Sequence, residues 1–187
     1  LLLMEKGADI KVRDCNGRTV LMYTGYGCSI NAAKRLVKSG ADINAVDNEG
    51  SNVFIHAASC GCIKLMEYLL SLGVNINTQN DPLRYTAIIN VCQTLKYMKN
   101  PAATVKFLID HGADVNLVTA SGYSALTYAV IEQDIEIVRL LLKAGADPRM
   151  NNYDASVIEY AFKSNNSKLI RIIFDSVSDV KGKWDYR

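Results

Sequence analysis

A glycine that opens Gly-Ala-Asp, or a close variant of it, recurs along the chain at nearly constant intervals. These glycines are Gly7, Gly40, Gly73, Gly112 and Gly145. Three of the four steps are 33 residues long (40−7, 73−40 and 145−112), and the fourth is 39 (112−73). A fixed period of this length is the signature of repeat architectures, so we predict a solenoid in which each unit packs mainly against its neighbours.

Residues suited to cap the N-terminus of a helix recur in the same register. They are Thr19, Asn52, Thr86, Ser124 and Ser156. Their side-chain oxygens can accept hydrogen bonds from the free N–H groups of a first helical turn. After Ser124 we expect a short helix, a loop and a longer helix that ends at Gly145, which can adopt the left-handed conformation. The longer helix is apolar on two sides, so it needs a neighbour on each.

These units resemble ankyrin repeats, whose pattern is D-x-x-G-x-T-P-L-H-x-A-A-x-x-G, then a second helix and G-A-D-x-N. The second unit matches clearly, from Asp47 to Gly50 and from Asn52 to Ala58. The proline of the pattern is replaced in every unit, by Val20, Val53, Ala87, Ala125 and Val157. The resemblance implies an all-α ankyrin-repeat solenoid of helix-turn-helix units with protruding β-hairpin loops.

We predict one array over residues 1–175. It comprises a partial repeat at 1–13, repeats at about 14–46, 47–80, 81–118, 119–150 and 151–175, and a capping tail or linker at 176–187. The third repeat is irregular, because Arg84 stands where its neighbours have glycine and an insertion near 96–101 lengthens the loop between its helices. The polar residues of the last repeat suit a terminal cap. Because the first residues match the end of a second helix, we expect a fragment of a longer array.

Composition excludes several partners and compartments. The net charge is only +2, from 21 basic and 19 acidic residues of scattered sign, so we expect no nucleic-acid or anionic-membrane partner. No apolar run approaches the roughly 20 residues that a membrane span requires. Five cysteines, an odd number in a chain able to build a core without disulfides, favour a reducing, cytoplasmic location. We expect a monomer.

The sequence contains little that could support catalysis. The two histidines, His56 and His111, fall in different repeats, and no phosphate-binding loop or hydrolase motif occurs. His56, Cys60 and Cys62 come nearest to a metal site, but a fourth ligand is missing. We therefore interpret these cysteines as packing residues and predict no enzymatic activity, cofactor or metal in this chain.

The resemblance implies a non-enzymatic module that binds a protein or peptide partner on its concave face, because variable turn and inner-helix positions of ankyrin repeats face partners. The candidate contact residues at these positions are Arg18, Glu49, Leu83, Tyr85, Tyr123, Tyr128, Ile131 and Tyr153. Tyrosine and arginine commonly anchor interfaces, and we select the patch from Tyr85 to Tyr153. A targeting or scaffold segment of a larger enzyme or host-interacting effector, with its catalytic domain outside this chain, is the alternative.

Two further sets of residues have competing interpretations. A row one residue before the small position of each first helix could pack between adjacent helices or contact a partner; it contains Tyr23, His56, Asn90, Tyr128 and Tyr160. The resemblance also implies that asparagines at the G-A-D-x-N position are hydroxylated in some organisms; here they are Asn44, Asn77 and Asn116. We favour a structural role for them, in which the side chain bonds the backbone of the loops.

Overall fold

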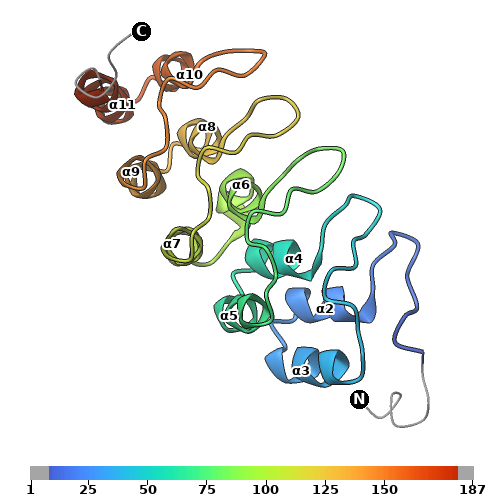
Figure 1. Cartoon of the computed structure of the whole chain (residues 1–187). Helices are drawn as coiled ribbons and strands as arrows, with labels where there is room; N and C mark the ends of the chain where they lie inside the picture. The colour runs from blue at the N-terminus through green and yellow to red at the C-terminus, as the bar shows by residue number, and fades with distance from the viewer. Residues whose placement is uncertain (1–8, 181–187) are drawn as a thin grey trace, which may run out of the picture.

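The computed structural model describes residues 9–180, with side chains up to residue 178 (Figure 1). Five helix pairs are stacked into an elongated array, which confirms the predicted all-α ankyrin solenoid. The inner helices are α2 (Val20–Tyr26), α4 (Val53–Ser59), α6 (Ala87–Gln93), α8 (Ala125–Ile131) and α10 (Val157–Lys163). The outer helices are α3 (Ile30–Lys38), α5 (Ile63–Ser71), α7 (Pro101–Asp110), α9 (Ile135–Lys143) and α11 (Ser167–Val180). The predicted partial repeat and the end of the tail fall largely outside the described residues.

Each inner helix begins at the predicted capping residue. The side chains of Asn52, Thr86, Ser124 and Ser156 each accept a hydrogen bond from the N–H group three residues later. Thr19 occupies the same position, but its buried hydroxyl has no hydrogen-bond partner. The caps fix where each helix starts and therefore the register of the whole array.

The periodic glycines end the outer helices, as predicted. Gly40, Gly73, Gly112 and Gly145 all have φ values between 85° and 91°. At the end of α9, the N–H groups of Gly145 and Ala146 donate to the carbonyls of Leu142 and Leu141, each at 3.0 Å. This pairing satisfies the last carbonyl groups of the helix and turns the chain toward the next loop.

The loops between repeats project beyond the inner helices, which lie between these loops and the outer helices (Figure 1). In place of extended hairpin strands, the described loops contain isolated antiparallel bridges. The bridged pairs are Arg13–Thr19, Val46–Asn52, Val118–Ser124 and Asn151–Ser156. In each bridge, one residue stands just before an inner helix, at the edge of the face that the loops and the inner helices form. We call this face the concave face.

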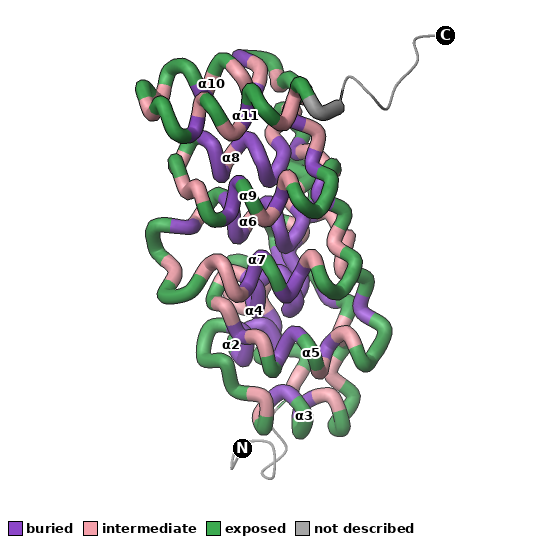
Figure 2. The backbone as a smooth tube through the Cα atoms, turned by 90° about the vertical axis from the view of Figure 1, so that its left-hand side faces the viewer, coloured by how far each residue is buried: buried purple, intermediate pink, exposed green. Residues whose placement is uncertain are grey.

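The core runs continuously along the array (Figure 2). On α8, Leu126 and Val130 are fully buried, and on α9 so are Ile137 and Leu141. Helix α9 contacts α7, α8 and α11, as expected for a helix that is apolar on two sides. Every inner helix contacts the next one along the chain, so the core is built from neighbouring repeats.

The third repeat absorbs its insertion locally. The extra residues form a short 3-10 turn, η1 (Leu95–Tyr97), that buries Leu95. The side chain of Asn100 then caps α7, and Pro101 takes the first helical position. In the loop before this repeat, Arg84 adopts φ +60° at the position where neighbouring repeats have glycine. With the insertion in place, α6 still contacts α4 and α8, and α7 still contacts α6 and α9.

The last repeat differs from our expectation. Helix α11 continues to Val180, past the boundary predicted at residue 175. Phe162 and Phe174 are 54% and 55% exposed, whereas Ala58 and Val130, which correspond to Phe162 in earlier repeats, are fully buried. Those residues are covered by the following repeat, and no described helix follows α11. The end of the described array therefore exposes two phenylalanines beside the polar residues that suggested a cap.

A disulfide joins Cys28, in the loop after α2, to Cys62, at the start of α5. The two Cα atoms are 5.0 Å apart, because the repeat period places the loop of one unit against the second helix of the next. We predicted cysteines without disulfides, and this pair is a correction. It also removes the support that the cysteines gave to a reducing compartment.

Candidate interaction surface

Four tyrosines form a continuous row across the third, fourth and fifth repeats. Tyr85 and Tyr123 lie immediately before the caps of α6 and α8, whereas Tyr128 and Tyr160 lie on α8 and α10. The ring of Tyr128 is stacked with those of Tyr85 and Tyr123, at centroid distances of 6.1 and 5.2 Å, and the Tyr123 ring lies 6.3 Å from that of Tyr160. We call these four residues the tyrosine ladder. All four side chains are only partly exposed.

The hydroxyl groups of the ladder form two separate hydrogen-bonded groups. In the first, Gln93 Nε2 donates to the Tyr85 hydroxyl at 3.0 Å, and the hydroxyls of Tyr85 and Tyr128 are 2.7 Å apart. In the second, the Tyr123 hydroxyl donates to Asp154 Oδ2 at 2.6 Å and lies 3.2 Å from the Tyr160 hydroxyl.

Asn152 Nδ2 completes the second group by donating to the Tyr160 hydroxyl at 3.3 Å. Because the Tyr123 proton points to Asp154, the Tyr160 hydroxyl must donate to Tyr123. Every hydroxyl proton in this second group therefore has an acceptor.

The surroundings of Tyr123 and Tyr128 disfavour ionisation of their hydroxyl groups. The hydrogen bond to Asp154, followed by that to Tyr160, raises the pKa of Tyr123. Burial, followed by the hydrogen bond to Tyr85, raises the pKa of Tyr128. The phenols of Tyr123 and Tyr128 therefore remain protonated at physiological pH and act as neutral hydrogen-bonding groups.

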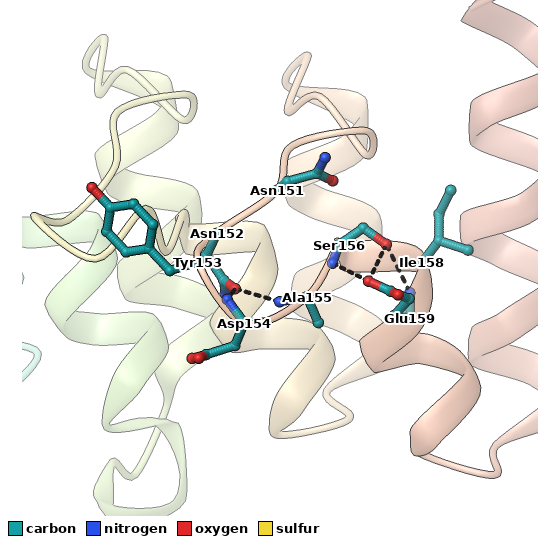
Figure 3. Close-up of a pocket in the computed structure, with 8 residues that line it drawn as sticks. All are labelled: Asn151, Asn152, Tyr153, Asp154, Ala155, Ser156, Ile158 and Glu159. Atoms are coloured by element: carbon teal, nitrogen blue, oxygen red, sulfur yellow. Dashed lines mark hydrogen bonds between the residues drawn. The ribbon is translucent and has the colours of Figure 1, made fainter.

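Three further predicted contact residues are exposed on the same repeats. Leu83 at the tip of the third repeat is 50% exposed, Ile131 at the end of α8 is 39% exposed, and Tyr153 is 86% exposed. Tyr153 lines a shallow pocket in the same loop, and Figure 3 shows its ring directed away from the other lining residues. Together with the ladder, these side chains give the third to fifth repeats a concave face rich in apolar surface.

Several polar groups of the pocket in Figure 3 are hydrogen-bonded to one another. The Glu159 carboxylate accepts hydrogen bonds from the N–H and hydroxyl groups of Ser156, at 2.6 and 3.0 Å. Asn152 Oδ1 accepts from the N–H groups of Asp154 and Ala155, both at 2.8 Å. These contacts fix the loop and the start of α10.

Arg18 belongs to a different cluster, in the first two repeats. Its guanidinium group lies over the Tyr26 ring at 5.5 Å, and its Nε is 3.9 Å from Asp47 Oδ2. The same Asp47 oxygen is 2.8 Å from His56 Nε2, and His56 Nδ1 is 3.0 Å from the Tyr26 hydroxyl. Burial lowers the pKa of His56, although Asp47 opposes this effect.

The structure thus separates the predicted contact residues into two groups. Tyr85, Tyr123 and Tyr128 belong to the ladder, whereas Arg18 belongs to the His56 cluster and Glu49 is an exposed residue in the turn of the second repeat. We did not predict that Gln93, Asn152 and Asp154 would orient the tyrosines. The residues four positions after each cap, the row that contains Tyr128, contact turn residues in several repeats. Outside the ladder, the hydroxyl of Tyr23, which belongs to this row, donates to the Asp14 carboxylate at 2.6 Å.

The weak metal motif is not assembled. Cys62 is in the disulfide, His56 Nε2 contacts Asp47, and the Cys60 side chain is exposed. In residues 9–180, no three His, Cys, Asp or Glu side chains are grouped closely enough to hold a metal ion. Among the helices of this same part of the chain, none is both long and apolar enough to cross a membrane.

Two of the periodic asparagines connect successive loops. Asn77 Nδ2 donates to the Gly112 carbonyl at 3.3 Å, and its Oδ1 accepts from the Asp114 N–H at 2.8 Å. Asn116 makes the same pair of bonds one repeat later, to Gly145 and Asp147, at 3.0 and 2.8 Å. These bonds confirm the structural role predicted for Asn77 and Asn116.

Comparison with known proteins agrees with the fold. A family model described as ankyrin repeats (3 copies) matches residues 1–80 and 82–183. Ankyrin repeat protein FPV115 of fowlpox virus is 40% identical over 149 residues, which cover 79% of this chain and 25% of that protein. Ankyrin repeat protein L92 of Acanthamoeba polyphaga mimivirus is 38% identical over 78 residues, covering 42% and 18%.

Human BCL-6 corepressor-like protein 1 is 28% identical over 114 residues, covering 57% of this chain and 6% of that protein. The chain thus spans at most a quarter of the length of each of these three relatives. The family model, in contrast, covers nearly all of this sequence. The chain therefore belongs to the ankyrin-repeat family.

Proposed function

We propose that this chain is a non-enzymatic interaction module that binds a protein or peptide on its concave face, at the tyrosine ladder and the exposed residues beside it. Ankyrin repeats generally mediate protein–protein interaction. The observation that carries the proposal is the concentration of tyrosine and exposed apolar side chains on one face of three consecutive repeats. Tyrosine is enriched among the residues that dominate binding energy at interfaces.

The mechanism we propose is preorganisation. The rings of the ladder are already held by stacking and by hydrogen bonds to Gln93, Asn152 and Asp154. Side chains that are ordered before binding lose little conformational entropy when a partner arrives, and this loss is a major cost of association. The stacked core below them gives the same benefit to the backbone, because it fixes the spacing of the loops.

A capture experiment tests this placement. The variant Leu83→Ala/Ile131→Ala/Tyr153→Ala removes exposed side chains of the face, and Leu72→Ala/Phe174→Ala is a matched control that removes exposed apolar side chains of the outer helices. Proteins captured from lysate by the wild type are identified by mass spectrometry. We expect the first variant to lose them and the control to retain them, with unchanged circular dichroism. Equal retention by both variants would refute the placement.

The alternative function is a targeting or scaffold segment of a larger enzyme or host-interacting effector. It is supported by the length of the relatives, which extend well beyond the regions that match this chain. It predicts that deleting this array from a longer protein displaces that protein from its partner while its chemistry in solution is unchanged. Loss of that chemistry on deletion would count against it.

A further inference from the structure

We propose that the ladder recognises an uncharged, proline-rich peptide in an extended polyproline conformation, with one of its carbonyl groups bound at the Tyr85–Tyr128 hydroxyl pair. This inference rests on the proposed function, since it specifies the partner of the same surface. It follows from three features of the described residues: an unused hydrogen-bond donor, uncharged helices and turn around the hydroxyl pair, and the lack of a strand edge.

The unused donor follows from counting protons. The hydroxyls of Tyr85 and Tyr128 each carry one proton, and the single contact between them uses one of the two. Gln93 donates to Tyr85 and so offers no acceptor. Whichever tyrosine donates to the other, one hydroxyl proton of the pair has no acceptor among the described residues. A hydroxyl proton without a protein acceptor can donate to a ligand that supplies one, such as a peptide carbonyl.

Charged side chains lie at the margins of the surface around this pair. Arg84 directly precedes Tyr85, and Asp154 accepts a hydrogen bond from the Tyr123 hydroxyl. Helices α6 and α8 contain no Asp, Glu, Lys or Arg, and neither does the turn at residues 119–123. Lys96 and Glu132, at the margin, have opposite charges and lie 3.9 Å apart. A strongly charged partner would lose its hydration here without gaining a counter-charge, so the complementary ligand is neutral.

The backbone geometry selects the conformation of that ligand. Addition of a strand requires a sheet edge, and the described loops offer only isolated bridges. A helical ligand uses most of its own carbonyl groups internally. A polyproline helix has no internal hydrogen bonds, exposes its carbonyls, and docks on aromatic surfaces in other recognition modules. The stacked rings of the ladder provide such a surface.

The experiment uses two capped peptides, acetyl-PPLPPLPP-amide and acetyl-AALAALAA-amide. Binding to the full chain is followed by NMR of isotope-labelled tyrosine rings. We expect the proline peptide to shift the Tyr85 and Tyr128 resonances and to bind more tightly than the alanine peptide. Equal affinity of the two peptides would overturn the proposal, as would shifts confined to tyrosines outside the ladder.

Two double variants test the hydrogen bond separately from the rings. Tyr85→Phe/Tyr128→Phe removes the unused donor but keeps both rings, so we expect a loss of about 2- to 10-fold in affinity for the proline peptide. Tyr123→Phe/Tyr160→Phe is the matched control, since the hydroxyl protons of that pair already have acceptors. Equal losses in the two variants would overturn the assignment of the carbonyl site.

These outcomes are distinguishable from failure of the broader proposal. If proteins captured from lysate depend on Leu83, Ile131 and Tyr153 but the proline peptide does not bind, the interaction module stands and the polyproline ligand is refuted. If the peptide binds at the ladder and the capture experiment shows no dependence on the exposed residues, the placement of the larger interface is refuted while the peptide site stands.

Discussion

At Gly50 there is no room for a Cβ atom beside the backbone of the next loop, so replacing it with alanine tests how the loops are stacked. A Cβ atom added at Gly50 would lie 2.3 Å from the backbone nitrogen of Asp81 and 2.7 Å from its carbonyl oxygen. Both atoms are main-chain atoms of the following loop, so a side-chain rotation cannot relieve the contact. That same loop carries Leu83 and Tyr85.

Gly40 provides the matched control. Both glycines have positive φ values, 74° for Gly50 and 90° for Gly40, but a Cβ atom at Gly40 has nothing within 4 Å. The left-handed backbone makes either alanine variant less stable by about 1–2 kcal/mol. Overpacking at Gly50 adds about 1–3 kcal/mol, because the two loops must move apart. We therefore expect Gly50→Ala to lose about 2–5 kcal/mol and Gly40→Ala about 1–2 kcal/mol.

Urea denaturation followed by circular dichroism measures this difference. With a denaturant slope of about 2 kcal/mol/M, the midpoint of Gly50→Ala should lie roughly 0.5–1.5 M below that of Gly40→Ala. Because the displaced loop carries Leu83 and Tyr85, partner capture by Gly50→Ala should also fall under conditions where the protein remains folded. Identical midpoints would refute the argument that the close approach at Gly50 sets the loop spacing.

Three further predictions concern other contacts between residues and repeats. Burial holds the pKa of His56 below its ordinary value of 6.5, so the stability that neutral His56 contributes is complete above that pH and is lost as the pH falls below it. The variant His56→Asn introduces the residue found at the corresponding position 90. Thermal melts at pH 7.5 and 5.5 should show a smaller drop in melting temperature on acidification for this variant than for the wild type. The disulfide closes a segment with a sequence separation of 34, so Cys28→Ser should lower the free energy of unfolding by up to about 4 kcal/mol without reductant and by far less with it. Asn116→Ala removes two bonds between loops and should cost about 1–2 kcal/mol in the same denaturation assay, whereas an unchanged midpoint would contradict the role of these bonds.

Much of this fold could be predicted because the constraints on it are local. A cap such as Ser124 and a left-handed glycine such as Gly145 act through hydrogen bonds to the few residues beside them, and these bonds depend on the residue type. Their recurrence fixed the register even where the family's proline is absent. The end of α11 could not be predicted in this way, because no glycine stands at its expected stop and the helix continues to Val180.

The contacts of the ladder depend on geometry between repeats, which single residues do not reveal. Tyr85 and Tyr128 are 43 positions apart, and the insertion in the third repeat obscures that spacing. The pairing becomes regular only when it is counted from the caps. Tyr85 and Tyr123 each stand one position before a cap, and Tyr128 and Tyr160 each stand four positions after the next one. The disulfide was missed for a similar reason, since Cys28 and Cys62 meet across two repeats.

The position just before each cap and the position four residues after the next cap explain why the two ends of the concave face differ in chemistry. In the first two repeats they are occupied by Arg18 and His56, and the charge of Arg18 contributes to lowering the pKa of His56. In the later repeats they are occupied by pairs of tyrosines that bond through neutral hydroxyls. In the later repeats the stacking geometry brings these two positions into contact on a partly exposed surface, whereas His56 at the first junction is buried. The N-terminal junction is therefore polar and titratable, whereas the two later junctions are aromatic.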